Sequence, residues 1–242
     1  MSLPKFCRPT TVVKLVSNGK SVEVQAHTMK DEQTLSIAKE SNKAHEILNA
    51  IGNLVQSCVI KPKNLDIRTL PIFDVVKLFI TIRSMSKGTN MQLYYKCTNC
   101  DMKNIETMVD LSNIEYSKPQ KPELIKVTPS MAIMPRYPSF GQSIELARVL
   151  DETEGKETVE QNLRLYASCI DKVYHEDEVT DTKDLSPDEV YDWFIELPEK
   201  VLTDMEKYIV SGPKTTLKVD VVCPKCGTKK TYTYTDLTDF FV

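Results

Sequence analysis

Two short segments, Cys97-Thr98-Asn99-Cys100 and Cys223-Pro224-Lys225-Cys226, decide how this chain folds. Each is a C-x-x-C motif, and about half of the chain lies between them. A structural zinc ion takes four ligands, whereas one such motif supplies only two thiolates. The sequence therefore predicts that the two motifs meet at one Zn²⁺ ion, with Cys97, Cys100, Cys223 and Cys226 as its ligands.

The similarity of the two segments extends beyond the cysteines. A β-prone run precedes each motif, Leu93-Tyr94-Tyr95 in the first and Leu217–Val222 in the second, and another extended stretch follows each. Asp110-Leu111 and Asp236-Leu237 then come at the same distance after the last cysteine. We interpret this as an internal repeat of strand, knuckle, strand and turn, and we expect the two copies to form one zinc ribbon.

Four thiolates fill the coordination shell of zinc, so the predicted site has no open position for a substrate or a water molecule. This favours a structural ion over a catalytic one. Neighbouring lysines would offset the negative charge of the shell: Lys96, Lys103, Lys225, Lys229 and Lys230. Two alternatives stay open, namely iron in the same four-cysteine shell and a redox-active dithiol.

Composition limits the remaining possibilities. The 242 residues include 31 Lys and Arg against 34 Asp and Glu, a net charge of −3, without a basic stripe of the kind that binds a phosphate backbone. Nucleic acid is therefore not expected as the main partner. We find no signal peptide and no long apolar run, which indicates a soluble protein of a reducing cytoplasm. Cys7, Cys58 and Cys169 are expected to be buried, unpaired thiols.

Before the first motif, the pattern is a β-hairpin followed by helices. Two alternating runs flank Asn18-Gly19, which predicts a type I′ turn. Helical periodicity then covers about Asp31 to Cys58, and a second helix is expected from Ile72 to Lys87, after Pro71 and before Gly88. Asp74 is expected to serve the helix dipole and to pair with Lys77.

Between the motifs, a polar linker (117–122) and a short strand (124–127) precede a helical pattern. The expected helices run over 143–151, 157–173, 186–197 and 199–210. The fold class is therefore α+β, a four-cysteine zinc ribbon formed by two distant knuckle hairpins, with a helical lobe inserted between them and an N-terminal β-hairpin. The expected domains are an N-terminal β-hairpin (1–28), a helical segment (29–90), a split zinc ribbon (91–128 and 214–242) and an inserted helical lobe (129–213).

Two acidic clusters, 151–154 and 175–178, raise the question of a divalent-metal or acid–base site. Neither cluster has the spacing of a calcium loop, and no accompanying His-x-x-x-His motif is found. Phosphate-binding glycine loops and nucleophile motifs are also missing from the sequence. We interpret the clusters as solvated loops, and we do not expect the protein to be an enzyme.

Several short segments of this sequence, in this order, resemble segments of baseplate hub assembly proteins of T4-like contractile-tailed bacteriophages. They are Leu70–Asp74, Arg83–Gly88, the first knuckle with Val109–Leu111, Arg136–Ser139, Ile170–Glu178, Gly212–Lys214, the second knuckle with Gly227, and Asp239–Phe241. The resemblance covers most of the chain after about residue 28. It implies a non-enzymatic hub assembly factor, or chaperone, or else a hub component, with other baseplate hub or tail proteins as partners.

The same resemblance implies action in the host cytoplasm during assembly, and it leaves open a place in the virion baseplate and a homo- or hetero-oligomeric state. As candidate partner contacts we select apolar residues outside the helical patterns: Met131, Met134, Tyr137, Phe140, Phe240 and Phe241. The alternative function is a zinc-ribbon protein that binds nucleic acid. A basic surface with exposed Tyr94, Tyr95, Tyr232 and Tyr234 would favour that alternative.

Overall fold

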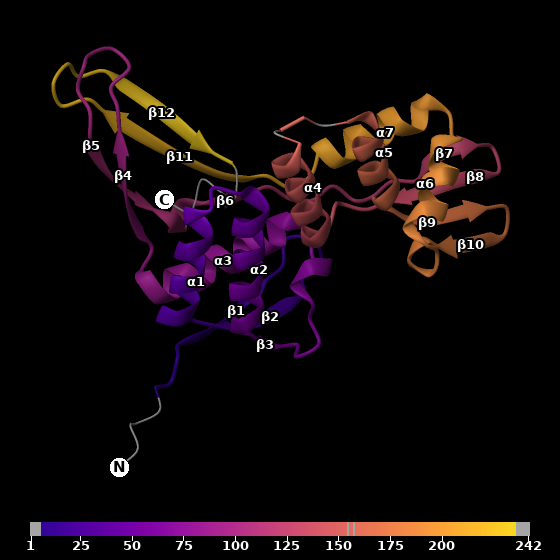
Figure 1. Ribbon diagram of the computed structural model, residues 1–242, viewed down its shortest axis with the longest axis horizontal. Coiled ribbons are helices and arrows are strands. Elements are labelled where there is room, and N and C mark those ends of the chain that lie inside the picture. The colour runs from indigo at the N-terminus through magenta and orange to yellow at the C-terminus, as the bar shows by residue number, and fades with distance from the viewer. Residues whose placement is uncertain (1–5, 154, 157, 236–242) are drawn as a thin grey trace.

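The protein is represented by a computed structural model that describes residues 6–153, 155–156 and 158–235 (Figure 1). The chain is a mixed fold of helices and small antiparallel sheets, which agrees with the expected α+β class. Among the helices of the described ranges, none has both the length and the apolar character that a membrane span needs.

The first part of the chain forms a compact N-terminal body. A three-stranded sheet of order β1-β2-β3 comprises β1 (Thr10–Lys14), β2 (Ser21–Gln25) and β3 (Val59–Lys61). Three helices pack with it: α1 (Met29–Glu40), α2 (Ala44–Cys58) and α3 (Ile72–Lys87), with a 3₁₀ turn at Ile67–Thr69. Val24, Ile51, Val55 and Leu78 are among the fully buried residues of this core.

The hairpin between β1 and β2 is present, but its turn is not of type I′. The backbone N–H of Leu15 donates to Lys20 O at 2.9 Å, which leaves a four-residue loop, 16–19. Of these residues only Gly19 has a positive φ (70°), whereas a type I′ turn needs two. The longer loop presents backbone N–H groups to Asp74 of α3, and this contact favours it over the tight turn.

The single helix expected from Asp31 to Cys58 is wrong, because the segment forms two helices. Asn42 lies between them with a φ of 54°, a conformation that no α-helix contains. Asp151 assists the restart, because its carboxylate accepts a hydrogen bond from the backbone N–H of His45 in the first turn of α2. The first turn of α2 is therefore capped by a residue more than a hundred positions away, which local periodicity does not show.

Helix α3 confirms the expected bounds, with Pro71 before it and Gly88 after it at a φ of 83°. Its charged residues differ from expectation. Asp74 binds the β1–β2 loop instead of pairing with Lys77, and the Lys77 ammonium lies 5.2 Å from the centre of the Tyr116 ring.

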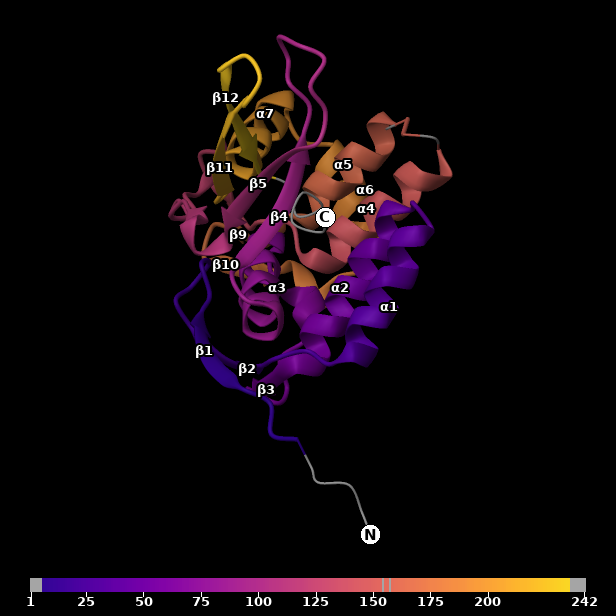
Figure 2. The same cartoon turned by 90° about the vertical axis from the view of Figure 1, so that its left-hand side faces the viewer.

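Two β-hairpins from distant parts of the chain come next in space. Strands β4 (Asn90–Tyr95) and β5 (Ile105–Asp110) form a two-stranded sheet, followed by a 3₁₀ turn at Leu111–Asn113. The second hairpin contributes to a sheet of order β12-β11-β6, made of β12 (Lys229–Tyr234), β11 (Thr215–Val222) and β6 (Glu115–Tyr116). Figures 1 and 2 show the two hairpins projecting together from the N-terminal body. We call this pair of hairpins the arm.

The segment between the hairpins is not purely helical, which corrects the expected helical lobe. It contains a four-stranded antiparallel sheet of order β10-β9-β8-β7, made of β7 (Ile125–Thr128), β8 (Met131–Pro135), β9 (Ile170–His175) and β10 (Glu178–Asp181). The helix expected over 157–173 stops early, because Ile170–His175 pairs with β8 as a strand. The apolar residues at the start of β9 happen to continue the helical period of the preceding segment, so periodicity alone does not show the boundary.

Four helices accompany this sheet: α4 (Phe140–Glu152), α5 (Val159–Ser168), α6 (Pro187–Ile195) and α7 (Glu199–Val210), with a 3₁₀ turn at Thr182–Asp184. Helices α5, α6 and α7 share a second core with the sheet, which includes the fully buried Ile133, Ile170 and Met205. We call this part the second lobe. Helix α4 packs instead on α2, and its Phe140 and Ile144 belong to the first core.

The junction between the lobes has a specific close approach. The backbone N–H of Phe140 donates to Leu70 O at 2.7 Å, and the fully buried Phe140 ring lies against Gly52 of α2. A Cβ atom on Gly52 would come within 2.8 Å of Phe140 Cε1. The glycine that weakens α2 by propensity is therefore needed for helix packing.

Candidate metal centre

The four cysteines of the two motifs meet at the end of the arm. Cys97 Sγ lies 3.6 Å from Cys226 Sγ, and Cys100 Sγ lies 3.7 Å from Cys223 Sγ. All four sulfur atoms lie within 4.8 Å of one another. These distances exceed the roughly 2.05 Å of a disulfide, so the sulfurs are not covalently paired. We call this group the cysteine cluster.

The cluster has the size of a tetrahedral zinc shell. With Zn–S bonds of about 2.3 Å, the sulfur atoms of a regular tetrahedron are about 3.8 Å apart. The two closest cross-hairpin distances are within about 0.2 Å of that value. Both hairpins contribute two ligands each, so neither could complete the shell alone.

The two knuckles share one backbone hydrogen bond, in agreement with the sequence repeat. The N–H of Cys97 donates to Met102 O at 2.9 Å, and the N–H of Cys223 donates to Thr228 O at the same distance. Their turns differ: the positive φ comes at Gly227 (72°), four residues after Cys223, but at Asn104 (58°), seven residues after Cys97. The second Asp-Leu pair of the repeat, Asp236-Leu237, lies outside the described residues.

Hydrogen bonds to sulfur further organise the cluster. The N–H of Asn99 lies 3.3 Å from Cys97 Sγ, and hydrogen bonding from this residue lowers the pKa of that thiol. Hydrogen bonds from Thr228 lower the pKa of Cys226 to about 6. A hydrogen bond from the backbone of Met102 acts in the same direction on Cys100, but burial and the neighbouring thiols outweigh it and raise the pKa of Cys100 to about 12. The pKa shifts of Cys97 and Cys226 are thus in the direction that favours the thiolate, the form that binds metal.

The cavity beside the cluster is too small for a substrate, although Cys226 itself is exposed. Cys97 and Cys223 are buried, and the cavity beside them measures about 10 Å³, roughly the space of a single water molecule. A catalytic zinc keeps an open coordination position with access for a reactant. The geometry fits a closed structural ion.

Tyrosines connect the two hairpins below the cluster. The rings of Tyr95 and Tyr232 lie 4.6 Å apart, and Tyr234 Oη donates to Tyr95 Oη at 2.9 Å. Tyr94 faces outward and is 63% exposed. Three of the four tyrosines considered for nucleic-acid stacking therefore pack inside the arm.

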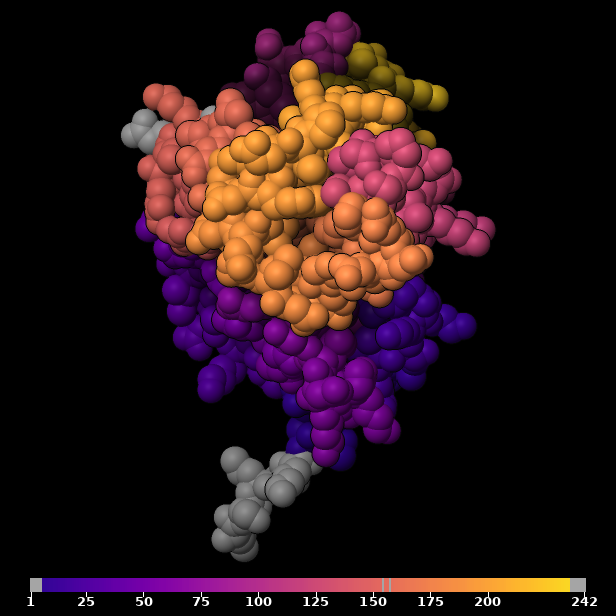
Figure 3. All heavy atoms as spheres, turned by 90° about the vertical axis from the view of Figure 1, so that its right-hand side faces the viewer, coloured from indigo at the N-terminus to yellow at the C-terminus, as the bar shows by residue number. Residues whose placement is uncertain are grey.

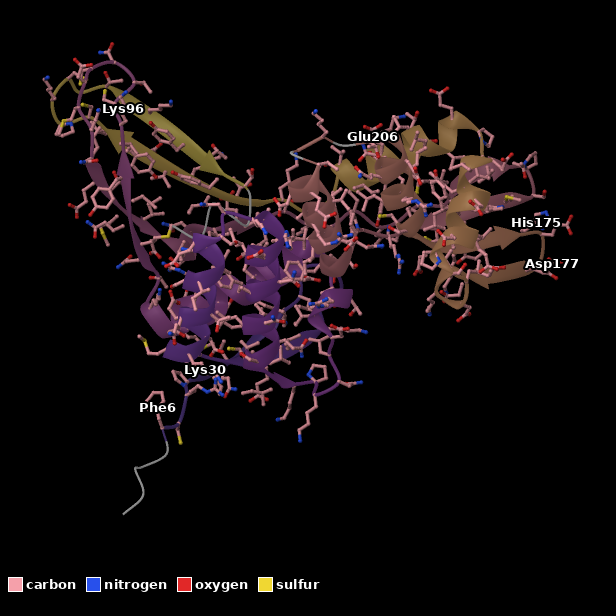
Figure 4. The ribbon with its side chains drawn as sticks, in the orientation of Figure 1. Phe6, Lys30, Lys96, His175, Asp177 and Glu206 are labelled. Atoms are coloured by element: carbon pink, nitrogen blue, oxygen red, sulfur yellow. The ribbon has the colours of Figure 1, made fainter. Side chains whose placement is uncertain are left out.

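The other sequence candidates are scattered. Cys58 and Cys169 are fully buried, as expected, whereas Cys7 is exposed, contrary to expectation. The acidic cluster at 175–178 forms the tip of the β9–β10 hairpin, and Figure 4 places its His175 and Asp177 at the opposite end of the molecule from Lys96, the neighbour of Cys97. Within the described residues, the cysteine cluster is the one group of three or more potential ligands with this proximity.

The candidate partner contacts divide into three kinds. Phe140 is fully buried against α2, so it is removed from the candidates. Tyr137 is half-buried and links the lobes: its ring stacks on Tyr208 at 4.6 Å and meets Phe73 edge-on at 5.4 Å. Met131 and Met134 lie in β8 and are half-buried. Phe240 and Phe241 lie outside the described residues.

A comparison with protein families now adds to this geometry. The family model described as T4 bacteriophage base plate protein matches residues 8–242. The chain belongs to this family. Comparisons with curated proteins and with solved structures gave no match. A protein of the T4 base plate family thus has four clustered cysteines on a projecting arm, and the sequence resemblance to phage baseplate proteins is confirmed over nearly the whole chain.

Proposed function

We propose that this protein is a non-enzymatic assembly factor or component of the phage tail baseplate hub, and that it binds other hub or tail proteins while the virion is built. The match of the base plate family to residues 8–242 is the observation that carries the proposal. Under this proposal the protein acts in the host cytoplasm during assembly, with the baseplate of the virion as its later location.

The proposed architecture supports a binding role. We propose that the arm is a zinc ribbon, in which one structural Zn²⁺ holds both hairpins through the cysteine cluster. The expected ribbon segments are 91–128 and 214–242, but residues 125–128 form β7 of the second lobe, and 236–242 lie outside the described residues. The ion adds a cross-link at the end of the arm, beyond the apolar contacts that Leu93, Val109 and Val219 already make in the first core. The arm then presents its outer face, with Tyr94 and Met108, at a fixed angle to the rest of the protein.

The second lobe offers another contact face. Along β8, Ile133 faces the core and Met134 therefore faces the opposite side of the sheet. Tyr174 and Val179 are paired across β9 and β10 on that same side, and Val179 is 57% exposed. Met134 thus remains a candidate contact, together with Met131 and with Phe240 and Phe241 of the C-terminal segment.

Recovery of partners from infected cells tests the function. We expect the tagged protein to bring down proteins of the tail baseplate, and Met131→Ser with Met134→Ser to reduce the yield. A matched control replaces the exposed Met29 and Ile37 of α1 by Ser, which removes apolar side chains that belong to neither proposed contact face. Recovery of nucleic acid without tail proteins would refute the proposal in favour of the zinc-ribbon alternative.

A further inference from the structure

A groove in the second lobe was not indicated by the sequence. One wall is formed by residues of α7 at helical spacing, and the other is the extended chain that leads into β7. The lining residues are Gln120, Lys121, Glu123, Leu124, Ile125, Lys126, Pro135, Lys200, Asp204, Lys207, Tyr208 and Ser211. Its volume is about 820 Å³, within the usual range of ligand sites. Figure 3 looks onto this lobe and shows the pink β7–β8 segment beside the orange surface of residues 175–210. We call this feature the lysine groove.

The groove is positively charged on a protein whose net charge is negative. Four lysines line it against two carboxylates, and one of these, Asp204, lies 3.2 Å from Lys207 Nζ. In the described ranges, no carboxylate lies within ion-pair distance of Lys121, Lys126 or Lys200. These three ammonium groups are exposed and available to a negatively charged partner.

The groove also includes Ile125 and Lys126 of β7, an edge strand. Strand β7 stands at the end of the order β10-β9-β8-β7, so one side of its backbone lacks a strand partner among the described residues. Such an edge is a template for an added strand, which gains main-chain hydrogen bonds along its length. Leu124, which is 48% exposed, and Tyr208 supply apolar surface in the groove.

We propose that the lysine groove binds an extended, acidic segment of a partner protein, which adds to β7 as a strand and places its carboxylates beside Lys121, Lys126 and Lys200. This inference rests on the proposed function and names the kind of tail-protein segment that the second lobe recognises. A polypeptide fits better than a nucleic acid, because only a peptide backbone can pair with the free N–H and C=O groups at the edge of β7.

A peptide-binding experiment tests the groove directly. The probe is a fluorescent ten-residue peptide of alternating valine and glutamate, and its binding is followed by anisotropy at low and high salt. We expect salt-sensitive binding to the full-length protein, weakened at least about tenfold in Lys126→Glu with Lys200→Glu, because each reversal replaces an attraction by a repulsion. The control, Lys14→Glu with Lys20→Glu, makes the same charge change on the β1–β2 hairpin and should alter affinity by less than about twofold.

Two further probes separate the alternatives. A version of the peptide with all backbone nitrogens methylated should lose binding, because strand addition needs the N–H donors that face β7. A ten-nucleotide oligothymidine should not bind. Failure of the acidic peptide to bind, equal weakening by both charge reversals, undiminished binding of the methylated peptide, or binding of oligothymidine would each overturn the proposal.

Recovery from infected cells distinguishes failure of the groove from failure of the function. If the wild-type protein and Lys126→Glu with Lys200→Glu recover tail proteins equally, the groove is not the contact while the assembly role stands. If the wild-type protein recovers no tail protein, the proposed function itself fails. Loss of recovery in the groove variant alone supports both.

Discussion

The carboxylate of Asp74 accepts a hydrogen bond from the backbone N–H of Val16, with 2.5 Å between Oδ1 and N. The same oxygen accepts a second bond from Ser17 N at 3.1 Å, and Asp74 is fully buried. Helix α3 and the β1–β2 loop are therefore held together by one side chain. The sequence predicts that Asp74 interacts with the helix dipole, whereas in the fold it also links α3 to the β1–β2 loop. We call this contact the Asp74 clamp.

Replacing this clamp should destabilise the N-terminal body. We expect Asp74→Ala to lower the free energy of unfolding by about 2–4 kcal/mol, because two charge-assisted hydrogen bonds are lost and two backbone donors become unsatisfied. Urea unfolding measures the change. Asp110→Ala serves as control, since Asp110 caps a surface 3₁₀ turn and should cost about 1 kcal/mol or less. Equal effects of the two substitutions would contradict the clamp.

The cysteine cluster should hold one zinc ion per chain. Cys226→Ser is expected to remove most of the metal and to lower solubility, because the binding free energy of a structural zinc is also folding free energy. Cys7→Ser, which changes an exposed thiol outside the cluster, should retain the full metal content. Elemental analysis of freshly purified protein decides between zinc and iron, and full metal content in Cys226→Ser would exclude this cluster as the site.

Gly52 should resist substitution although alanine is the better helix former. The intrinsic gain from Gly52→Ala is about 1 kcal/mol, whereas overpacking of a core costs about 1–3 kcal/mol. Since the new Cβ would meet the buried Phe140 ring at 2.8 Å, we expect net destabilisation in thermal unfolding. In a protein that already carries Phe140→Leu, Gly52→Ala should lower the free energy of unfolding by a smaller amount. If the effects of the two substitutions on stability simply add, the close approach of Gly52 and Phe140 is refuted.

Tyr137 should couple the two lobes through its ring rather than its hydroxyl. The ring contacts Phe73 of α3 and Tyr208 of α7, and a Cβ on Gly212 would lie 3.1 Å from Tyr137 Cε1. The hydroxyl is buried and finds no hydrogen-bond partner among the described residues. We expect Tyr137→Phe to change stability by less than about 0.5 kcal/mol and Tyr137→Ala to cost about 2 kcal/mol.

Calorimetry adds a second criterion for this residue. Each lobe has its own core, so a weakened junction should split the unfolding of Tyr137→Ala into two transitions, while Tyr137→Phe keeps the wild-type profile. Identical profiles for both variants would show that the aromatic contact does not couple the lobes.

Asp151 should make stability depend on pH in the acid range. A hydrogen bond from the backbone N–H of His45 lowers the pKa of Asp151 below its ordinary value of about 3.9. Its contribution is therefore present above about pH 4 and is lost as pH falls through the lower, folded-state pKa. The melting temperature of Asp151→Asn should lie below that of the wild type at pH 7, and the two should converge below about pH 4. Asp184→Asn, at an exposed position of the second lobe, is the control.

The features that the sequence determined are those encoded by local chemistry. The spacing of the cysteines and the duplicated pattern around them indicated two matching knuckles, because zinc needs four ligands and each turn offers two. Pro71 and Gly88 indicated the ends of α3. Pro71 has no backbone N–H and therefore favours a helix start after it, and Gly88 accepts the positive φ with which the chain leaves the helix.

Tertiary structure decided what depends on distant partners. Strand β9 forms because β8 offers it a neighbour, α2 restarts at a carboxylate from α4, and the β1–β2 loop follows the position of Asp74. Phe140 looked like a surface contact because nothing local to it shows that Gly52 leaves a space for its ring. No single segment of the sequence predicts the lysine groove, because its two walls come from parts of the chain that only folding brings together.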